Sequence, residues 1–164
     1  MEQYIKLFVP LGTQKFPFNR LVEKLNCMVN EGKYRAEEIV MQSSVYEVRP
    51  IFKHYDLVPA ELFNNLIDNA ELVITHGGVN SIISCMTRRK PLVITPRFME
   101  YGEHVDNHQV EIAKLMKNKF DVIVVEDMTK LPEAIDAAIH HEYRQWVSHN
   151  KELISAIKDV VDRM

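Results

Sequence analysis

Two adjacent glycines, Gly77 and Gly78, follow His76 where the sequence changes from a strand pattern to a helix pattern. The apolar run before them is typical of a buried strand, and a helix pattern follows with Ser81 in its first turn. Glycine has no Cβ, so a ligand could approach the main chain closely. The helix start would offer unpaired N–H groups and the positive end of the helix dipole, which suit a phosphate. The alternative is an ordinary tight turn in which Ser81 caps the helix.

Two other polar segments also follow apolar runs. One comes after residues 4–9 and holds Gly12, Thr13 and Gln14. The other, 97–109, comes after the run 91–96 and ends in His104, Val105, Asp106, Asn107, His108 and Gln109. If the apolar runs are parallel strands, ligands bind outside their carboxyl ends, so the three segments would meet at one rim. This convergence indicates a binding site more strongly than any single motif.

The elements that must position these segments alternate between strand and helix patterns. Short apolar runs predict strands over 4–9, 38–42, 51–55, 71–75, 91–96 and 122–125. Apolar residues at helical spacing predict helices over 17–31, 60–69, 81–87 and 110–116, and after residue 129. Strands of this kind imply a parallel sheet covered on both faces, and right-handed crossovers make it doubly wound. The predicted fold class is α/β, with a Rossmann-like doubly wound parallel sheet.

Particular residues are expected at the ends of these helices. Pro17 would open the first helix at its first position, and Gly32 would end it. Thr129 would cap the helix that contains Pro132 in its first turn. The charged run 88–90 is expected to be a solvated helix end that favours the dipole.

The C-terminal residues 141–164 are predicted to form an amphipathic helix that belongs to the same domain as residues 1–140. His140 and His141 would be a solvated linker before it. The helix either packs back on the domain or serves as a docking face for a partner. Its apolar stripe comprises Trp146, Val147, Ile154, Ile157 and Val161.

Length and composition exclude several classes of protein. The 164 residues suit one domain, and the net charge of −3 gives no support for nucleic-acid binding. There is no G-x-G-x-x-G after the first strand and no P-loop, which disfavours dinucleotide and ATP sites. Cys27 and Cys85 are expected to be reduced core thiols in a cytoplasmic protein. No apolar run approaches the ~20 residues needed to span a bilayer, so contact with a membrane would go through a partner or a surface helix.

Three motifs, in order and each at a strand end, carry a family resemblance. They are Gly12-Thr13-Gln14-x-Phe16-Pro17-Phe18-x-Arg20-Leu21, Thr75-His76-Gly77-Gly78, and Tyr101-Gly102-Glu103-His104-Val105-Asp106-x-His108-Gln109. Roughly residues 4–139 resemble the small catalytic subunits of two-part bacterial polysaccharide glycosyltransferases. Those are similar to the soluble subunit of the eukaryotic dolichol-linked N-acetylglucosaminyltransferase and to the carboxy-terminal half of glycosyltransferase family 28. The resemblance implies the donor-binding half of a GT-B glycosyltransferase.

The resemblance also implies roles for residues. The loop Gly12-Thr13-Gln14 would touch the donor phosphates, and Gly77, Gly78 and Ser81 would hold the diphosphate. Asn80 stands where the family usually has glycine, and its tolerance of left-handed conformations would preserve the turn. The segment Asp106, Asn107, His108 and Gln109 would contact the donor sugar and fix its loop, and main-chain groups near Val58 would face the uracil ring.

The histidines leave alternatives open. His76 could be a catalytic base, a phosphate contact or a structural side chain, and the latter two are favoured. His104 and His108 lie four residues apart, a spacing that also suits metal ligands. Donor binding or loop bracing is favoured for both, and neither a metal nor a cofactor is expected. Glu103 could act as an acid or base, but a favourable charge at a helix N-terminus explains it equally well.

The function implied is transfer of a hexose from a UDP-sugar to a lipid-linked saccharide, with inversion, in exopolysaccharide or capsule biosynthesis. A membrane-anchored partner subunit would bind the acceptor and supply the general base. The chain would be cytoplasmic and peripheral at the inner face of the membrane through that partner. One alternative is a non-catalytic nucleotide-sugar-binding or activating subunit, and another is a stand-alone enzyme acting on a small soluble substrate.

Overall fold

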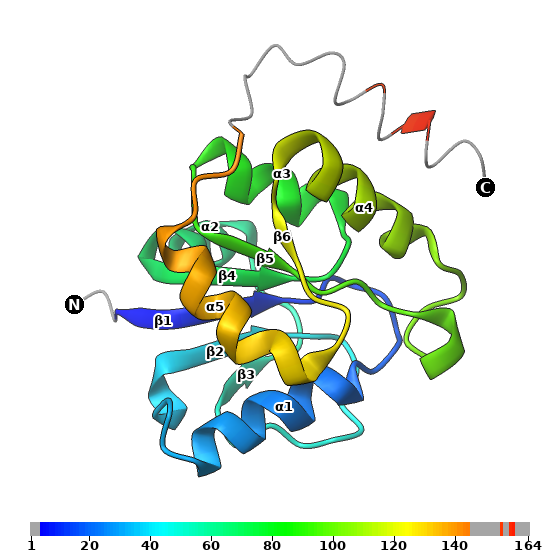
Figure 1. Cartoon of the computed structure of the whole chain (residues 1–164). Coiled ribbons are helices and arrows are strands. Elements are labelled where there is room, and N and C mark those ends of the chain that lie inside the picture. Colours follow the sequence, from blue (N-terminus) through cyan, green and yellow to red (C-terminus); the bar gives the residue numbers. More distant parts are fainter. Residues whose placement is uncertain (1–3, 145–154, 156–157, 160–164) are drawn as a thin grey trace.

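The computed structural model describes residues 4–144, 155 and 158–159, and its centre is a six-stranded parallel sheet (Figure 1). The strand order is β3-β2-β1-β4-β5-β6. The chain therefore winds outward from β1 to one edge, returns to β4 and winds to the other edge. The strands are β1 (Ile5–Pro10), β2 (Ile39–Gln42), β3 (Lys53–Tyr55), β4 (Ala70–Thr75), β5 (Leu92–Ile94) and β6 (Ile123–Val124). This topology confirms the predicted doubly wound α/β fold.

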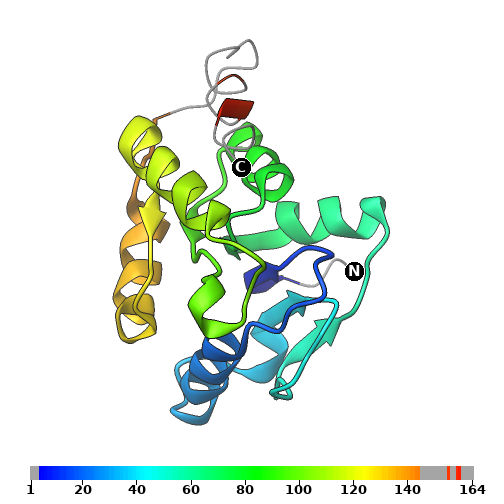
Figure 2. The same ribbon diagram turned by 90° about the vertical axis from the view of Figure 1, so that its right-hand side faces the viewer.

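Helices cover both faces of the sheet, as Figures 1 and 2 show. Helices α1 (Asn19–Asn30) and α5 (Leu131–His140) pack on one face. Helices α2 (Ala60–Asn69), α3 (Val79–Thr87) and α4 (His108–Phe120) pack on the other. Three short 3-10 turns complete the described elements: η1 (Ala36–Glu38), η2 (Met99–Tyr101) and η3 (Met128–Lys130).

The core consists of two apolar layers, one on each side of the sheet. Along β1, Phe8 packs toward α2, α3 and α4, whereas Leu7 and Val9 pack toward α1 and α5. Because successive side chains of a strand point to opposite faces, a strand buried on both faces must be apolar at most positions. The charged residues Lys6 of β1 and Glu71 of β4 are only partly buried. This requirement explains the continuous apolar runs of the sequence.

The roles predicted for Pro17 and Thr129 at helix ends need correction. Helix α1 begins at Asn19 after the cap residue Phe18, so Pro17 precedes the helix instead of opening it. Gly32 ends α1 as predicted, with φ of +78° and its N–H donating to the carbonyl of Val29. Thr129 does not cap α5, because it lies in η3, where Asp127 is the cap residue and accepts from the Thr129 N–H at 3.0 Å. The cap position of α5 is Lys130, which makes no capping bond with its side chain.

The two cysteines differ in exposure. Cys85 is buried in the layer beneath α3, as expected. Cys27 is exposed, and its thiol donates to the Glu31 carboxylate at 3.2 Å. The expectation of a second core thiol is wrong because the buried stripe of α1 runs through Leu25 and Met28, and Cys27 lies beside that stripe on the solvent side.

The charged run 88–90 is less solvated than predicted. The Arg88 guanidinium donates to Asp68 at 2.9 Å and to Asn64 at 2.9 Å, and Lys90 donates to the carbonyl of Ala70 at 2.8 Å. These bonds join the end of α3 to the end of α2. His141 is also engaged, since its Nε2 lies 2.6 Å from the carbonyl oxygen of Asp121.

Residues 141–144 form neither helix nor strand. The apolar stripe predicted for the C-terminal helix lies outside the described residues; Ser155, Lys158 and Asp159 are described, and all three are helical. Within the part of the chain that the structure describes, no helix has the length and apolar character needed to cross a membrane.

Candidate functional site

The three polar segments lie at one edge of the sheet, as predicted. Figure 2 looks onto this edge, toward which β1 and β4 point in Figure 1. The Thr75 hydroxyl at the end of β4 donates to the carbonyl of Pro10 at the end of β1 at 3.3 Å. The Thr95 N–H after β5 donates to the carbonyl of Thr75 at 2.8 Å. The loops after β1, β4 and β5 therefore start side by side.

A pocket of about 330 Å³ opens between these loops. This volume lies at the lower end of the roughly 300–1,000 Å³ typical of small-molecule sites. Eight of its lining residues were predicted from sequence: Gly12, Thr13, Gln14, Val58, His76, Gly78, Asn80 and Ser81. Four were not: Gln42, Leu57, Phe63 and Val79.

Helix α3 begins at this pocket without a capping side chain. Its cap residue is Gly78, in an extended conformation, and the first main-chain bond runs from Ile82 N–H to the Gly78 carbonyl. The N–H groups of residues 79–81 precede that bond and have no acceptor within the helix. The alternative of a Ser81 cap is therefore wrong, because Ser81 is already the third helical residue. The arrangement suits an anion.

Asn80 needs no left-handed conformation. It lies in α3, and the non-glycine residues with positive φ in the described chain are Arg89 and Asp121. The expected reliance on the tolerance of asparagine for such conformations is wrong, because a helical position accepts any ordinary residue. The Asn80 side chain is exposed and lines the pocket.

His76 lies at the floor of the pocket beneath two glycines. A Cβ added at Gly78 would lie 2.5 Å from the His76 Nε2, and one added at Gly12 would lie 2.9 Å from the same atom. Burial, followed by the nearby charge of Arg97, lowers the pKa of His76 to about 3. The imidazole is therefore neutral at physiological pH. This favours a hydrogen-bonding role over that of a general base, which works best with a pKa near the operating pH.

Gln109 braces the site from behind. Its side chain is 6% exposed and does not line the pocket. Its Oε1 accepts from the main-chain N–H of Gly77 at 3.2 Å and of Arg97 at 3.1 Å. Its Nε2 lies 2.9 Å from the His76 Nδ1. Two roles were expected for residues 106–109, contact with the donor sugar and fixing of the loop. The contacts of Gln109 fix the loop.

Arg97, which sequence reasoning missed, joins two of the loops. Its guanidinium is fully buried and donates to the carbonyls of Leu11 at 3.0 Å, Phe16 at 2.7 Å and Glu103 at 3.1 Å. It also packs over the Phe18 ring at 5.3 Å. An arginine after a strand is ordinarily exposed, so the sequence carries no signal for this role.

Glu103 is a structural partner, not an exposed acid or base. Its carboxylate is buried and accepts two bonds from the guanidinium of Arg20, at 2.8 and 2.9 Å. It also accepts from the main-chain N–H of Phe98 at 3.0 Å. A carboxylate held this way is a weak candidate for proton transfer.

Asp106 connects the other two histidines predicted for the site, His104 and His108. Its carboxylate lies 3.1 Å from the His104 Nδ1 and 2.8 Å from the His108 Nδ1, and it accepts from the His108 main-chain N–H at 3.0 Å. The Asn107 side chain accepts from the Met99 N–H at 2.9 Å. These four side chains brace the loop and do not line the pocket. Within residues 4–144, 155 and 158–159, no group of three or more His, Cys, Asp or Glu side chains is arranged to hold a metal ion.

Gln42 is the missed residue that a sequence signal could have revealed. It is a polar residue at the carboxyl end of β2, where ligands bind in such sheets. Its Oε1 accepts from the Gly12 N–H at 3.1 Å, and its Nε2 donates to the carbonyls of Gly12 and Asp56 at 2.8 and 2.7 Å. The apolar lining residues Leu57, Phe63 and Val79 resemble core positions in sequence and give no such signal.

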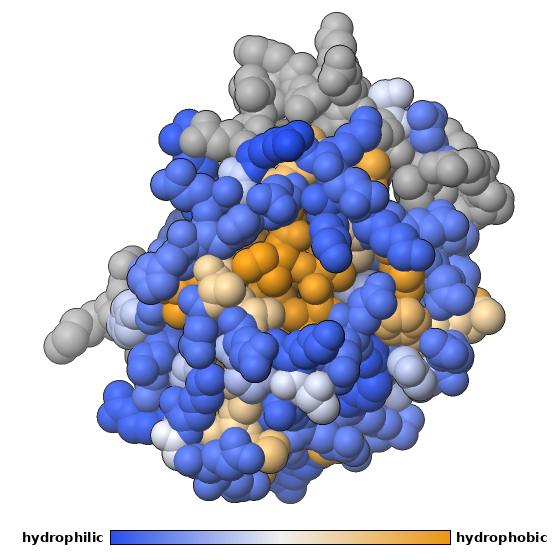
Figure 3. Space-filling view, in the orientation of Figure 1, coloured by the Kyte–Doolittle hydropathy of each residue, from blue (hydrophilic) through white to orange (hydrophobic). Residues whose placement is uncertain are grey.

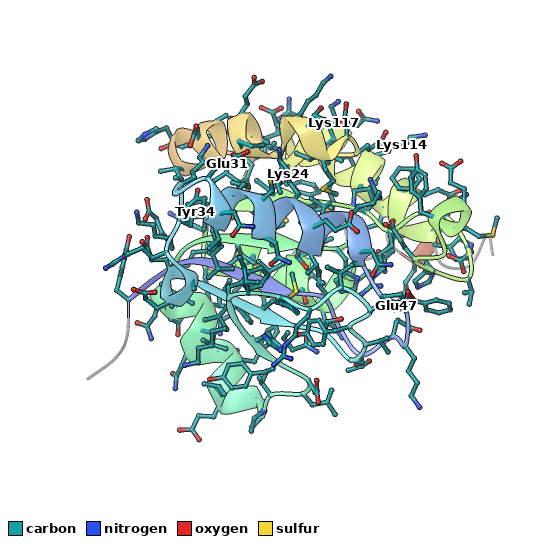
Figure 4. All side chains as sticks on the ribbon, turned by 90° about the horizontal axis from the view of Figure 1, so that it is seen from below. Lys24, Glu31, Tyr34, Glu47, Lys114 and Lys117 are labelled. Carbon is teal, nitrogen blue, oxygen red and sulfur yellow. The ribbon has the colours of Figure 1, made fainter. Side chains whose placement is uncertain are left out.

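Two larger hollows lie on the flanks of the molecule. One of about 710 Å³ lies between α1, η2 and η3, and one of about 690 Å³ lies between α4 and α5 beside β6. Figure 3 shows apolar surface framed by polar side chains in the region where Figure 1 draws β6. Figure 4 labels Lys24 of the first hollow and Lys114 and Lys117 of the second. Among the described residues, neither hollow is lined by a glycine loop or by His76, so the smaller pocket, where α3 begins, is the candidate site.

Comparison with known proteins agrees with the fold and the motifs. Residues 6–164 match the model of the glycosyltransferase family 28 C-terminal domain. The chain belongs to this family. A stretch of 87 residues is 34% identical to the UDP-N-acetylglucosamine transferase subunit ALG13 of Candida albicans. That stretch is 53% of this chain but 24% of the relative, so the chain spans about a quarter of the relative's length.

Solved structures show the same fold. An NMR structure of ALG13 matches 94% of this chain and 96% of its own, with a TM-score of 0.59 and 19% identity. The spinosyn forosaminyltransferase SpnP matches 99% of this chain but 40% of its own, with a TM-score of 0.57 and 13% identity. The family 28 domain therefore has here the Rossmann-like fold of one domain of a GT-B glycosyltransferase.

Proposed function

We propose that this chain is a glycosyltransferase subunit that binds a UDP-sugar and, with a membrane-associated partner, transfers the sugar to a lipid-linked saccharide. The observation that carries the proposal is the uncapped start of α3, which opens into the pocket above the neutral His76 imidazole. The similarity to the Candida UDP-N-acetylglucosamine transferase subunit supports both the UDP-sugar donor and the role as a subunit. The setting in exopolysaccharide or capsule synthesis rests on the motif resemblance.

The pocket offers separate surfaces to the two ends of a nucleotide. The N–H groups at the start of α3, together with the side chains of Thr13, Asn80 and Ser81, would bind the diphosphate. The apolar wall of Leu57, Val58 and Phe63 would pack on the flat uracil ring, with main-chain groups near Val58 meeting its polar edge. The main chain of loop residues 104–107 would border the sugar, and Gln109 would brace this loop from behind.

The pocket alone lacks a general base. The described residues that line it include no carboxylate, and the pKa of His76 is lowered to about 3. The chain also covers only 40% of the length of SpnP. We therefore assign the base and the acceptor site to the partner subunit, which would hold this chain at the inner face of the membrane.

The proposed reaction is a single in-line displacement with inversion. The acceptor hydroxyl oxygen forms a bond to the anomeric carbon as the bond from that carbon to the UDP oxygen breaks. The hydroxyl proton passes to the base of the partner. Negative charge develops on the departing diphosphate, where the fixed N–H donors of α3 stabilise it. The proposal requires neither a metal nor a cofactor for this step.

Thermal melting of the chain with UDP, a panel of UDP-sugars and ADP tests the donor site. A ligand at about 100 times its dissociation constant adds roughly 2.7 kcal/mol of stability. At this chain size each kcal/mol raises the melting temperature by roughly 2–4 °C. We expect a rise of several degrees with UDP, a larger one with a single UDP-sugar and none with ADP. No rise with any of them, for the chain alone and with its partner co-expressed, would overturn the proposal.

The alternative of a non-catalytic activating subunit is favoured by one observation, the lack of a base among the described pocket residues. The substitution Asn80→Asp separates it from the proposal. A carboxylate at the start of a helix is compatible with folding, but it would repel a diphosphate. We expect the activity of the reconstituted pair to fall at least tenfold, with Asn65→Asp on the exposed face of α2 as the matched control. Unchanged activity would favour the activating subunit.

A further inference from the structure

The hydrogen bonds of Gln109 determine which end of its side-chain amide is the oxygen. The atom assigned as Oε1 lies 3.2 Å from the Gly77 nitrogen and 3.1 Å from the Arg97 nitrogen. Both are main-chain N–H groups, which can only donate. The atom that faces them must therefore be the acceptor, and the NH₂ group must point the other way.

The amide orientation then determines the proton on His76. The Gln109 NH₂ lies 2.9 Å from the His76 Nδ1 and can only donate to it. A nitrogen that accepts a hydrogen bond carries no proton. In the neutral imidazole the single proton is therefore on Nε2, the atom that lies against Gly12 and Gly78 at the pocket floor.

We propose that Gln109 is a positioning residue that fixes the Nε2–H tautomer of His76, so that the imidazole offers the pocket a hydrogen-bond donor and no basic nitrogen. The donor serves an anionic oxygen of the ligand, a consequence that rests on the proposed function. Gln109 acts from the start of α4 without touching the ligand itself.

The surroundings of Gln109 hold its amide in this orientation. The Gly77 and Arg97 N–H groups follow β4 and β5, adjacent parallel strands, so reversing the amide would direct its NH₂ group at two donors. The Arg97 guanidinium is held by three carbonyls, and burial lowers the pKa of the imidazole, so a second proton on His76 is disfavoured. The tautomer is thus set by main-chain groups of the sheet edge.

Long-range proton–nitrogen NMR of the full, uniformly labelled chain near neutral pH tests the proposal. Imidazole nitrogens that carry a proton and those with a lone pair resonate in separate regions of the nitrogen spectrum. The chain has seven histidines, and the signals that disappear in His76→Gln are those of His76. We expect a protonated Nε2 and a lone-pair Nδ1 in the wild type. A proton on Nδ1, either in the other neutral tautomer or in an imidazolium ion, would overturn the proposal. The wild-type spectrum is sufficient for this test.

The substitution Gln109→Glu tests the cause. One carboxylate oxygen would still accept from Gly77 and Arg97, and the other would require a proton from His76, so Nδ1 should become protonated. Asn107→Asp is the matched control, since it places the same charge in the same loop and keeps the acceptor for Met99. We expect it to leave the tautomer unchanged. A lone-pair Nδ1 that persists in a folded Gln109→Glu would overturn the role of Gln109.

These spectra need no nucleotide, which separates this inference from the proposed function. The tautomer is measured in the free protein, whereas the proposed function depends on the UDP melting shift. A wild type with the Nε2–H tautomer and no response to UDP would reject the donor site and leave the tautomer of His76 as assigned here.

Discussion

The main-chain N–H of Gly77 donates to the side-chain oxygen of Gln109 at 3.2 Å, and a Cβ at Gly77 would lie 2.5 Å from the Gln109 Cβ. The turn after β4 and the start of α4 thus approach each other as closely as a glycine allows. The two adjacent glycines, Gly77 and Gly78, therefore have different structural roles. Gly77 admits Gln109 from behind, whereas Gly78 admits His76 and begins the helix that faces the pocket.

Gly77→Ala should therefore disrupt packing. Its Cβ would lie 2.7 Å from both the Cα and the carbonyl oxygen of Gln109, and main-chain atoms cannot turn aside as a flexible side chain can. Overpacking of this kind costs about 1–3 kcal/mol of unfolding free energy, measured by urea denaturation. Gly102→Ala is the control, since its Cβ would meet nothing within 4 Å and only the positive φ of 70° would be strained. Equal losses in the two variants would contradict the packing argument.

Arg97→Met should destabilise the rim. The carbonyls of Leu11, Phe16 and Glu103 would lose their donor, and an unsatisfied buried acceptor costs about 1–3 kcal/mol. We expect a loss of at least about 3 kcal/mol in urea denaturation, with Arg97→Lys intermediate because one ammonium cannot match the planar fork. Arg49→Met, at an exposed position, should change the stability little. A loss below 1 kcal/mol for Arg97→Met, by the same measure, would count against its role in joining the loops.

His76 should make the protein less stable in acid. Its folded pKa is about 3, below the ordinary value of 6.5 expected for the unfolded chain. Between these values the unfolded state binds a proton that the folded state does not, so stability falls as the pH drops from about 6.5 toward 3. The slope from this one group is at most roughly 1.4 kcal/mol per pH unit. Denaturation of wild type and His76→Gln across this range should show a shallower slope in the variant, and parallel curves would contradict the assignment.

The cysteines should react differently with a thiol reagent. Cys27 is exposed, although its hydrogen bond to Glu31 raises the pKa of its thiol and slows the reaction. Cys85 is fully buried, and burial raises its pKa to about 12. Because the thiolate is the reactive form, mass spectrometry should find one label on the native protein and two after unfolding. Cys27→Ser should abolish native labelling, and rapid labelling of native Cys85 would contradict the packing of α3.

The order of strands and helices could be predicted from the sequence, because the strands of a buried parallel sheet are apolar runs that alternate with helical spacing. Strands β1 and β4 are buried on both faces over most of their length, and each is an apolar run with one charged residue, Lys6 or Glu71. Helix α2 was predicted with its observed bounds, 60–69, because Pro59 precedes it and its apolar spacing is regular. Capping was predicted less well, since Asp127 and Thr129 are both plausible caps and only the hydrogen bond distinguishes them.

The sheet, its carboxyl edge and the three loops that meet there could be predicted from the amino-acid pattern alone. Strand periodicity is a local property, and the rule for ligand sites in α/β sheets depends only on topology. It also placed eight of the pocket's lining residues. Which side chains face the pocket and which brace it became clear from the folded chain. Gln109 and Asp106 turn inward to main-chain and histidine partners, and Arg97 is buried beneath two loops. Those outcomes depend on groups far apart in the chain, whose hydrogen bonds must be satisfied once water is excluded.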